Sequence, residues 1–174
     1  MENILQIIQI IASLAAIISI IYLAKQIHQQ STIHSENHEW NRRIETQKAL
    51  DAYNRLESVV ALNQKFEFMQ KKHAIPCSDI LEAVKDSNLR VHMARLLNYY
   101  ENLSNGVDLG IYDEEIIKSA RRNVMIRTFE AFSEYMDYER RERNHLAYVK
   151  FRAIVEKWTK EGEQTLVLKK LGNV

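Results

Sequence analysis

The sequence predicts an all-α protein in which one N-terminal transmembrane helix continues into a cytoplasmic helical bundle. Three observations predict this fold class. An apolar run without charge stands near the N-terminus, and apolar residues recur mostly three or four positions apart through the rest of the chain. Among 174 residues only four are glycine and one is proline. With so few helix breakers, long helices are the simplest way to build the fold.

Composition narrows the function classes. Charged residues make up 27% of the chain and the formal net charge is +1, which argues against a dedicated DNA-binding protein. Cys77 is the single cysteine, so no internal disulfide forms and a reducing compartment fits. We expect its thiol to be a small buried apolar group. The sequence contains no glycine-rich phosphate loop or catalytic triad, and it predicts no cofactor.

Residues 4–24 form the predicted membrane span. They carry no charge, and at about 1.5 Å per residue they cover roughly 30 Å, the thickness of a bilayer core. A cleavable signal peptide is the alternative, but no lysine or arginine precedes the run and the residues after it make a poor cleavage site. We therefore expect the segment to remain attached.

The basic residues near the span predict its orientation. Lys25, Arg42 and Arg43 follow the run and no basic residue precedes it. The positive-inside rule then places the C-terminal part of this single-pass membrane protein in the cytoplasm. The predicted division is a transmembrane anchor over residues 1–30 and a cytoplasmic helical domain over residues 31–174.

Gln6, Gln9 and Ser13, three of the four polar residues of the span, share one side of the helix. At 100° per residue, several positions fall within one arc of about 80° and later positions continue it. They pack several copies together, or they line a pore in which Ile20 and Ile27 form an apolar constriction. The residues alone favour packing, and a pore requires a ring of copies. The arc contains Gln6, Gln9, Ser13, Ala16, Ile20, Ile27, His34 and His38.

The next segment, residues 31–72, is predicted to be one long helix that ends before Pro76. Asp79 and Glu82 resemble a capping pair for the following helix. Residues 86–88 mark a kink, and Asn105 with Gly106 closes the helix after them. The predicted buried stripe of the long helix is Ile44, Ala49, Tyr53, Leu56, Val60 and Phe66, and that of the later helix is Leu89, Leu96, Leu97, Tyr100 and Leu103.

Two further helices complete the predicted bundle. Asp113 begins the first of them, with two glutamates in its first turn. The charged stretch 139–145 follows, and then a helix over residues 146–160 that Gly162 ends. No segment shows a convincing strand pattern. The cytoplasmic part is therefore expected to be one all-helical bundle.

His34 and His38 stand four residues apart, which places both imidazoles on one helix face. No cysteine and no second histidine pair accompanies them, so a solvated face is the preferred interpretation and no metal site is predicted. In a symmetric ring the histidines of neighbouring copies would approach one another. Their protonation near neutral pH would then affect assembly.

Arg140 and His145 form an Arg-x4-His pattern. This motif resembles that of the higher-eukaryote-and-prokaryote nucleotide-binding (HEPN) domains, where the histidine acts as acid or base and the arginine steadies the phosphate. With six histidines in the chain, about one such match is expected by chance. Arg141 stands where that family commonly has Asn, Asp or His. The alternative interpretation is an exposed charged turn or a subunit contact.

Arginines are frequent in the C-terminal third. They form a basic surface for RNA or anionic lipid, or a mixed solvated face, because acidic residues interleave with them. The candidates are Arg121, Arg122, Arg127, Arg140, Arg141, Arg143 and Arg152.

One span, a helical domain and Arg140-x4-His145 late in the chain together resemble the small membrane accessory proteins encoded beside the RNA-guided ribonuclease of type VI-B CRISPR systems. The stretch over residues 97–114 also resembles a broader group of single-span bacterial proteins. The first resemblance implies a HEPN-like fold and a homo-oligomeric ring in the lipid bilayer, with eight subunits as one candidate size. It implies a pore that depolarises the inner membrane and enhances antiviral immunity by the guided ribonuclease.

This resemblance changes how two features are interpreted. It favours the pore over simple packing for the arc that begins at Gln6, and it makes Arg140 and His145 a divergent relic or a structural contact. Two other hypotheses stay open. One is a membrane-tethered ribonuclease that cuts RNA with Arg140 and His145, and the other is a non-catalytic scaffold that recruits a cytoplasmic partner to the membrane.

Overall fold

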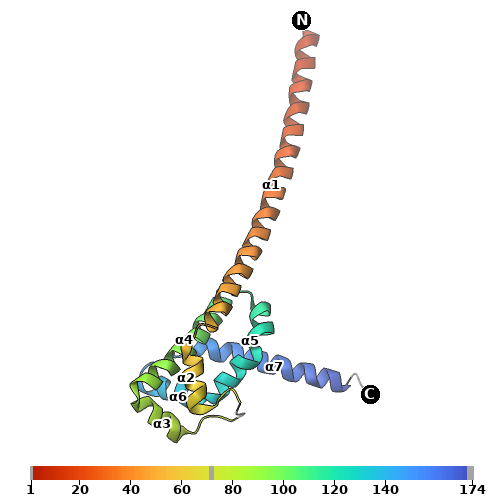
Figure 1. Cartoon of the computed structure of the whole chain (residues 1–174). Helices are drawn as coiled ribbons and strands as arrows, with labels where there is room; N and C mark the ends of the chain where they lie inside the picture. The colour runs from red at the N-terminus through yellow and green to blue at the C-terminus, as the bar shows by residue number, and fades with distance from the viewer. Residues whose placement is uncertain (1, 71–72, 172–174) are drawn as a thin grey trace. The chain divides into compact units, whose positions relative to one another are not determined.

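The protein is built from α-helices, as the sequence predicts (Figure 1). The computed structural model describes residues 2–70 and 73–171, with the side chains of residues 2–17, 35 and 165–171 outside that description. Within these limits there is no strand. The helices are α1 (Glu2–Tyr53), α2 (Glu57–Phe66), α3 (Cys77–Lys85), α4 (Ser87–Asp108), α5 (Glu114–Ala131), α6 (Ser133–Glu142) and α7 (Val149–Leu171).

The chain divides into two compact units, Met1–Asn41 and Arg42–Val174. The first unit is the N-terminal part of α1, and the second contains the end of α1 together with α2–α7. The predicted boundary after residue 30 lies earlier, because the end of the apolar run was the signal that set it.

Among the residues that the structure describes in full, no helix is both long and apolar enough to cross a membrane. The predicted span, residues 4–24, lies largely outside them, because the side chains of residues 2–17 are not described. The backbone of α1 is helical over all 52 residues from Glu2 to Tyr53.

Helix α4 packs against α2, α3 and α7. Its buried face matches most of the predicted stripe, with Leu96, Leu97, Tyr100 and Leu103 all buried. The ring of Phe151 on α7 stacks on Tyr100 with their centroids 5.1 Å apart. Full burial of one such side chain contributes about 1.5–3 kcal/mol. The contact between α4 and α7 is therefore a main source of stability.

The single long helix predicted over residues 31–72 is wrong. Helix α1 ends at Tyr53, Leu56 has an extended backbone, and α2 begins at Glu57. No glycine or proline stands at this break. The cause is tertiary packing, which in proteins outweighs the local preference of a segment to continue as a helix.

The packing of α2 on α4 explains the break. This contact buries Leu62 and Phe66. The turn before α2 also changes which side of the segment faces the core. Val60 belonged to the predicted buried stripe, but it is 60% exposed, whereas Leu62 was not predicted and is fully buried.

Two aspartates begin helices through their side chains. Asp113 caps α5 as predicted, since its carboxylate accepts hydrogen bonds from two backbone N–H groups in the first turn. Asp86 does the same for α4 at 2.8 and 3.3 Å. The predicted kink at residues 86–88 is therefore a boundary between α3 and α4, because these caps satisfy N–H groups that have no partner within the helix.

The predicted capping pair of Asp79 and Glu82 is wrong. Helix α3 begins directly after Pro76, and no side chain caps it. Proline suits this position because it lacks the N–H group that would go unpaired. Cys77, the first residue of α3, is exposed, which contradicts the expectation of a buried thiol.

Two glycines expected to end helices lie inside them instead. Helix α4 continues past Gly106, and α7 continues past Gly162 to Leu171. A Cβ atom at Gly106 would lie 2.2 Å from the ring of Tyr112, and one at Gly162 would lie 2.3 Å from the Arg122 guanidinium. Both glycines therefore make room for a neighbouring side chain.

A buried hydroxyl ties the end of α1 to the start of α5. Thr46 is fully buried, and its hydroxyl donates to the carbonyl oxygen of Arg42 and accepts from the N–H of Asp113, both at 2.7 Å. The Arg42 guanidinium donates to the Asp113 carboxylate at 3.2 Å. The Tyr99 hydroxyl on α4 donates to the carbonyl oxygen of Ala49 at 3.0 Å. Residues 42–53 are thus held on the helical bundle by directed bonds.

Substituting Thr46→Val tests this tie, because valine keeps the shape of the side chain but can neither donate nor accept. The part-buried N–H of Asp113 would lose its partner, which costs about 1–3 kcal/mol. We expect the free energy of unfolding of the purified full chain to fall by that amount in chemical denaturation followed by circular dichroism. Thr32→Val is the matched control, since the exposed Thr32 hydroxyl makes the same bond to the carbonyl oxygen four residues earlier. Equal losses in both variants would contradict the role of the buried bond.

Candidate functional site

The predicted pore-lining positions follow one side of α1. Because the helix is unbroken, its period places positions 6, 9, 13 and 16 on a common arc. The side chains of Gln6, Gln9, Ser13 and Ala16 lie outside the described residues. Ile20 and Ile27 on the same arc are described, and each is 66% exposed.

Large apolar side chains are exposed in the first described turns of α1. Ile18, Ile21, Tyr22 and Leu23 are between 55% and 70% exposed. Successive residues of a helix point about 100° apart, so these side chains cover several directions. Contiguous apolar surface of this kind marks a site of contact with membrane or protein.

His34 and His38 face each other across one turn of α1. Their Nε2 atoms are 3.0 Å apart, and their ring centroids are 4.4 Å apart with an interplanar angle of 82°. Both residues are exposed. Within the described part of the chain, no three His, Cys, Asp or Glu side chains are grouped to hold a metal ion. The pair therefore presents two imidazole nitrogens on an exposed face of α1.

The side chain of Arg140 contacts His145 at the backbone carbonyl of His145. Arg140 lies in the last turn of α6, and its Nε donates to the carbonyl oxygen of His145 at 3.4 Å. His145 lies in the segment between α6 and α7, and it is exposed. The guanidinium therefore steadies the turn that carries the histidine, and the bond does not involve the imidazole. This contact matches the alternative of a structural role for the motif.

Most arginines of the predicted basic surface have partners within the second unit. The Arg122 guanidinium donates to the carbonyl oxygen of Trp158, Arg127 to that of Met69, and Arg152 to the carboxylate of Asp137. Arg121 lies over the ring of Tyr53. These bonds favour the mixed, internally paired face over a continuous basic surface for RNA or lipid.

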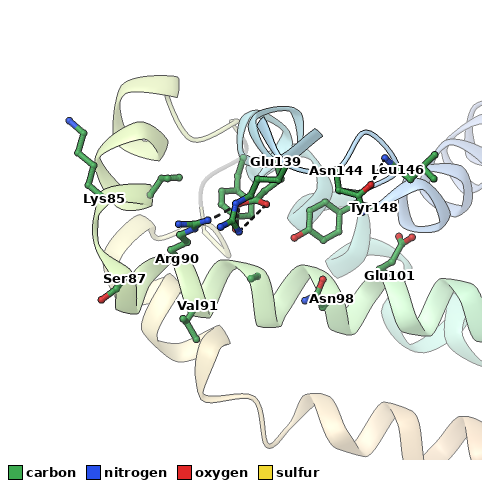
Figure 2. Close-up of a pocket in the computed structure, with 15 residues that line it drawn as sticks. Lys85, Ser87, Arg90, Val91, Asn98, Glu101, Glu139, Asn144, Leu146 and Tyr148 are labelled. Atoms are coloured by element: carbon green, nitrogen blue, oxygen red, sulfur yellow. Dashed lines mark hydrogen bonds and ion pairs between the residues drawn. The ribbon is translucent and has the colours of Figure 1, made fainter. Parts of the chain in front are cut away.

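A cleft of about 680 Å³ lies beside the turn that carries His145. Its lining comes from α3, α4, α6 and the segment between α6 and α7, so the fold assembles it from distant parts of the sequence. Figure 2 shows Arg90 and Glu139 pointing toward one another, with Tyr148 close by. Lys85 at the rim points away from them.

Glu139 is the buried charge of this cleft, at 9% exposure. The Nε atom of Arg90 is 3.9 Å from its Oε1, and the Nη1 atom of Arg143 is 3.7 Å from its Oε2. The Tyr135 hydroxyl donates to Oε1 at 3.2 Å. A buried carboxylate needs such partners, because leaving water is costly for a charge. Through them Glu139 links α4, α6 and the segment that follows α6.

The two tyrosines of the cleft keep their protons over a wide pH range. Burial raises the pKa of Tyr148 to about 12, and the negative charge of Glu139 adds to the effect. Burial raises the pKa of Tyr135 as well, with Tyr148 and Glu139 as further causes. Both hydroxyls therefore serve as hydrogen-bond donors at neutral pH, which suits the role of Tyr135 beside the carboxylate.

Glu101 on α4 stabilises the start of α7 from the same cleft. Its carboxylate oxygens accept hydrogen bonds from the backbone N–H groups of Lys150 at 3.2 Å and Phe151 at 2.8 Å. A negative charge at a helix N-terminus also interacts favourably with the helix dipole. The cleft thus fixes both ends of the segment between α6 and α7.

The supporting residues of this site were missed in the sequence, where Glu139 was only the first residue of a charged stretch. A usable signal existed. Tyr135, Met136 and Glu139 fall on one face of α6, and all three are buried. Arg90 and Glu101 gave no local signal, because only the packing of α4 beside α6 and α7 brings them to this place.

A family described as "Domain of unknown function (DUF4760)" matches residues 4–158. The chain belongs to this family. The DUF4760 match includes the predicted span, the Glu139 cleft, and both Arg140 and His145. No curated protein and no solved structure matches the chain.

Substituting Glu139→Gln tests the cleft as a structural support of the DUF4760 domain. The change removes the negative charge that Arg90 and Arg143 share, so we expect the free energy of unfolding to fall by about 1–3 kcal/mol. Glu142→Gln is the matched control, since Glu142 is exposed on the same helix. Chemical denaturation of both variants measures the difference. A Glu139→Gln chain as stable as Glu142→Gln would show that the buried charge does not hold the segment.

Proposed function

We propose that this DUF4760 protein forms a homo-oligomeric pore in the bacterial inner membrane, with its second unit in the cytoplasm. The observation that carries the proposal is the uncharged run of residues 4–24 at the start of an unbroken 52-residue helix. Such a run has the length of a bilayer core. The exposed apolar side chains of residues 18–23 support the same assignment, because lipid would cover them.

Polar residues in the run are the reason to propose assembly. Gln6, Gln9 and Ser13 share one arc, and amide or hydroxyl groups in lipid are costly unless they meet other polar groups or water. Several copies that turn this arc inward satisfy them. One helix cannot enclose a channel, so the pore is a ring, for which eight subunits is a candidate size. Ile20 and Ile27 then form an apolar constriction that closes by dewetting.

The biological role of the pore follows from the resemblance to the accessory proteins of type VI-B CRISPR systems. The ring depolarises the inner membrane when the RNA-guided ribonuclease cuts viral RNA, and it thereby enhances antiviral immunity. The bonds of Thr46 support a coupling between the cytoplasmic bundle and the pore. They fix the end of α1 to the bundle, so that a movement of α5 is transmitted to the helix.

Replacing Gln6, Gln9 and Ser13 together by leucine tests the pore directly. We expect the variant to insert into membranes but to lose at least about tenfold in conductance, because the inner arc becomes apolar and excludes water. Ion flux through vesicles that contain the purified full chain measures this.

Ser19→Leu is the matched control, since residue 19 lies in the same uncharged run but outside the arc. We expect its conductance to equal that of the unmodified chain. Unchanged membrane potential in cells that carry the guided ribonuclease and its target RNA would overturn the pore. A strictly monomeric chain in lipid would overturn the assembly on which it depends.

A membrane-tethered ribonuclease is the second candidate function. It is supported by His145, which lies in the segment between α6 and α7 and is exposed to a second copy or to RNA. This function predicts cleavage of single-stranded RNA by the purified chain, with loss of at least about 100-fold in rate in His145→Ala. His73→Ala is the control, since His73 is exposed elsewhere in the second unit. Intact RNA after incubation with the unmodified chain would end this candidate.

A non-catalytic membrane scaffold is the third candidate. It shares the anchor with the pore, and it predicts co-purification of a cytoplasmic partner without conductance and without RNA cleavage. The three candidates therefore differ in what one purified preparation does.

A further inference from the structure

We infer that His34 and His38 bind a divalent transition-metal ion such as Zn²⁺, and that two copies of the chain share this ion. The inference rests in part on the proposed homo-oligomer, because one chain supplies only half of the ligands. The observation behind it is the position of the two rings, whose Nε2 atoms are 3.0 Å apart on an exposed face of α1.

The spacing of the two nitrogens fits a metal ion. Imidazole nitrogens bind Zn²⁺ at about 2.0–2.1 Å, so two of them at a tetrahedral angle are separated by about 3.3–3.4 Å. The observed 3.0 Å differs by a few tenths of an ångström, which small side-chain rotations supply. The spacing of four residues between two histidines on one helix is also found in zinc-binding His-Glu-x-x-His helices. Here Ser35 follows the first histidine, so no general base accompanies the pair and no hydrolytic chemistry is inferred.

A metal ion can take the place of the one proton that lies between the two Nε2 atoms. Two Nε2 atoms at this distance share a hydrogen bond only when one ring donates and the other accepts. A metal ion binds the unprotonated nitrogen of each ring in place of that proton. Both rings are exposed, so the ion reaches them without opening the fold. No glycine or proline occurs before Pro76, so the helix backbone that sets the spacing is not interrupted.

A second copy completes the ligand set. Zn²⁺ prefers four ligands in a tetrahedral arrangement, and the described part of one chain groups no third ligand with the pair. His34 and His38 lie on the same arc of α1 as Gln6, Gln9 and Ser13. When the copies assemble with this arc facing inward, the histidine pairs of two neighbouring copies together supply four imidazoles. The site lies about 15 Å beyond the predicted span, so the ion links neighbouring helices at the cytoplasmic end of the pore.

The test is a titration of the tag-free full chain in detergent with Zn²⁺, in competition with a chromogenic chelator. We expect one ion for every two chains. His34→Gln and His38→Gln should each weaken binding by about tenfold or more. His28→Gln is the matched control and should bind as the unmodified chain does, because His28 is exposed on the same helix but lies off the arc.

Three outcomes would overturn the inference. Binding that survives both His34→Gln and His38→Gln, or no binding at all, removes the site, and one ion per chain removes the sharing between copies. Particle size and ion flux measured on the same preparations keep this test separate from the proposed function. A ring that conducts but binds no Zn²⁺ in the titration ends the metal site alone. A monomer that binds one ion per chain ends both the sharing and the ring.

Discussion

The hydroxyl of Thr46 is the interaction on which the architecture depends. It joins the carbonyl oxygen of Arg42 to the N–H of Asp113, so the C-terminal end of α1 and the N-terminal end of α5 meet at one fully buried atom. The Arg42–Asp113 and Tyr99–Ala49 bonds hold the same end of α1 on the bundle. The C-terminal end of α1 therefore belongs to the second unit, where Leu50 and Tyr53 are part of its core.

A second set of bonds fixes the segment between α6 and α7. Glu139 attracts Arg90 from α4 and Arg143 from the segment after α6, while Glu101 accepts from the first N–H groups of α7. Arg140 and His145 lie on the segment that these bonds hold. A motif of nuclease type is thereby placed on a rigid turn, with its arginine bonded to the histidine backbone. This arrangement agrees better with a structural contact than with a free catalytic pair.

The arc of α1 relates the proposed pore to the inferred metal site. In both proposals, the polar groups of the apolar run and the paired imidazoles on the same side of the helix gain partners from further copies. Assembly would therefore be favoured at two heights along the helix, by amides in the predicted span and by a metal ion beyond it. The DUF4760 match covers both heights together with the bundle, which indicates that they belong to one domain.

The sequence by itself determined the features that depend on near neighbours. The all-α fold follows from the scarcity of breakers, the buried face of α4 from its period, and the start of α5 from Asp113. Tertiary structure decided the rest. Contacts with distant segments ended α1 at Tyr53 and started α2 at Glu57. They also buried Glu139 within a charged run, and they placed Gly106 and Gly162 inside helices against bulky neighbours. Periodicity reports which residues share a face, but only packing decides which face meets the core and which charge finds a partner there.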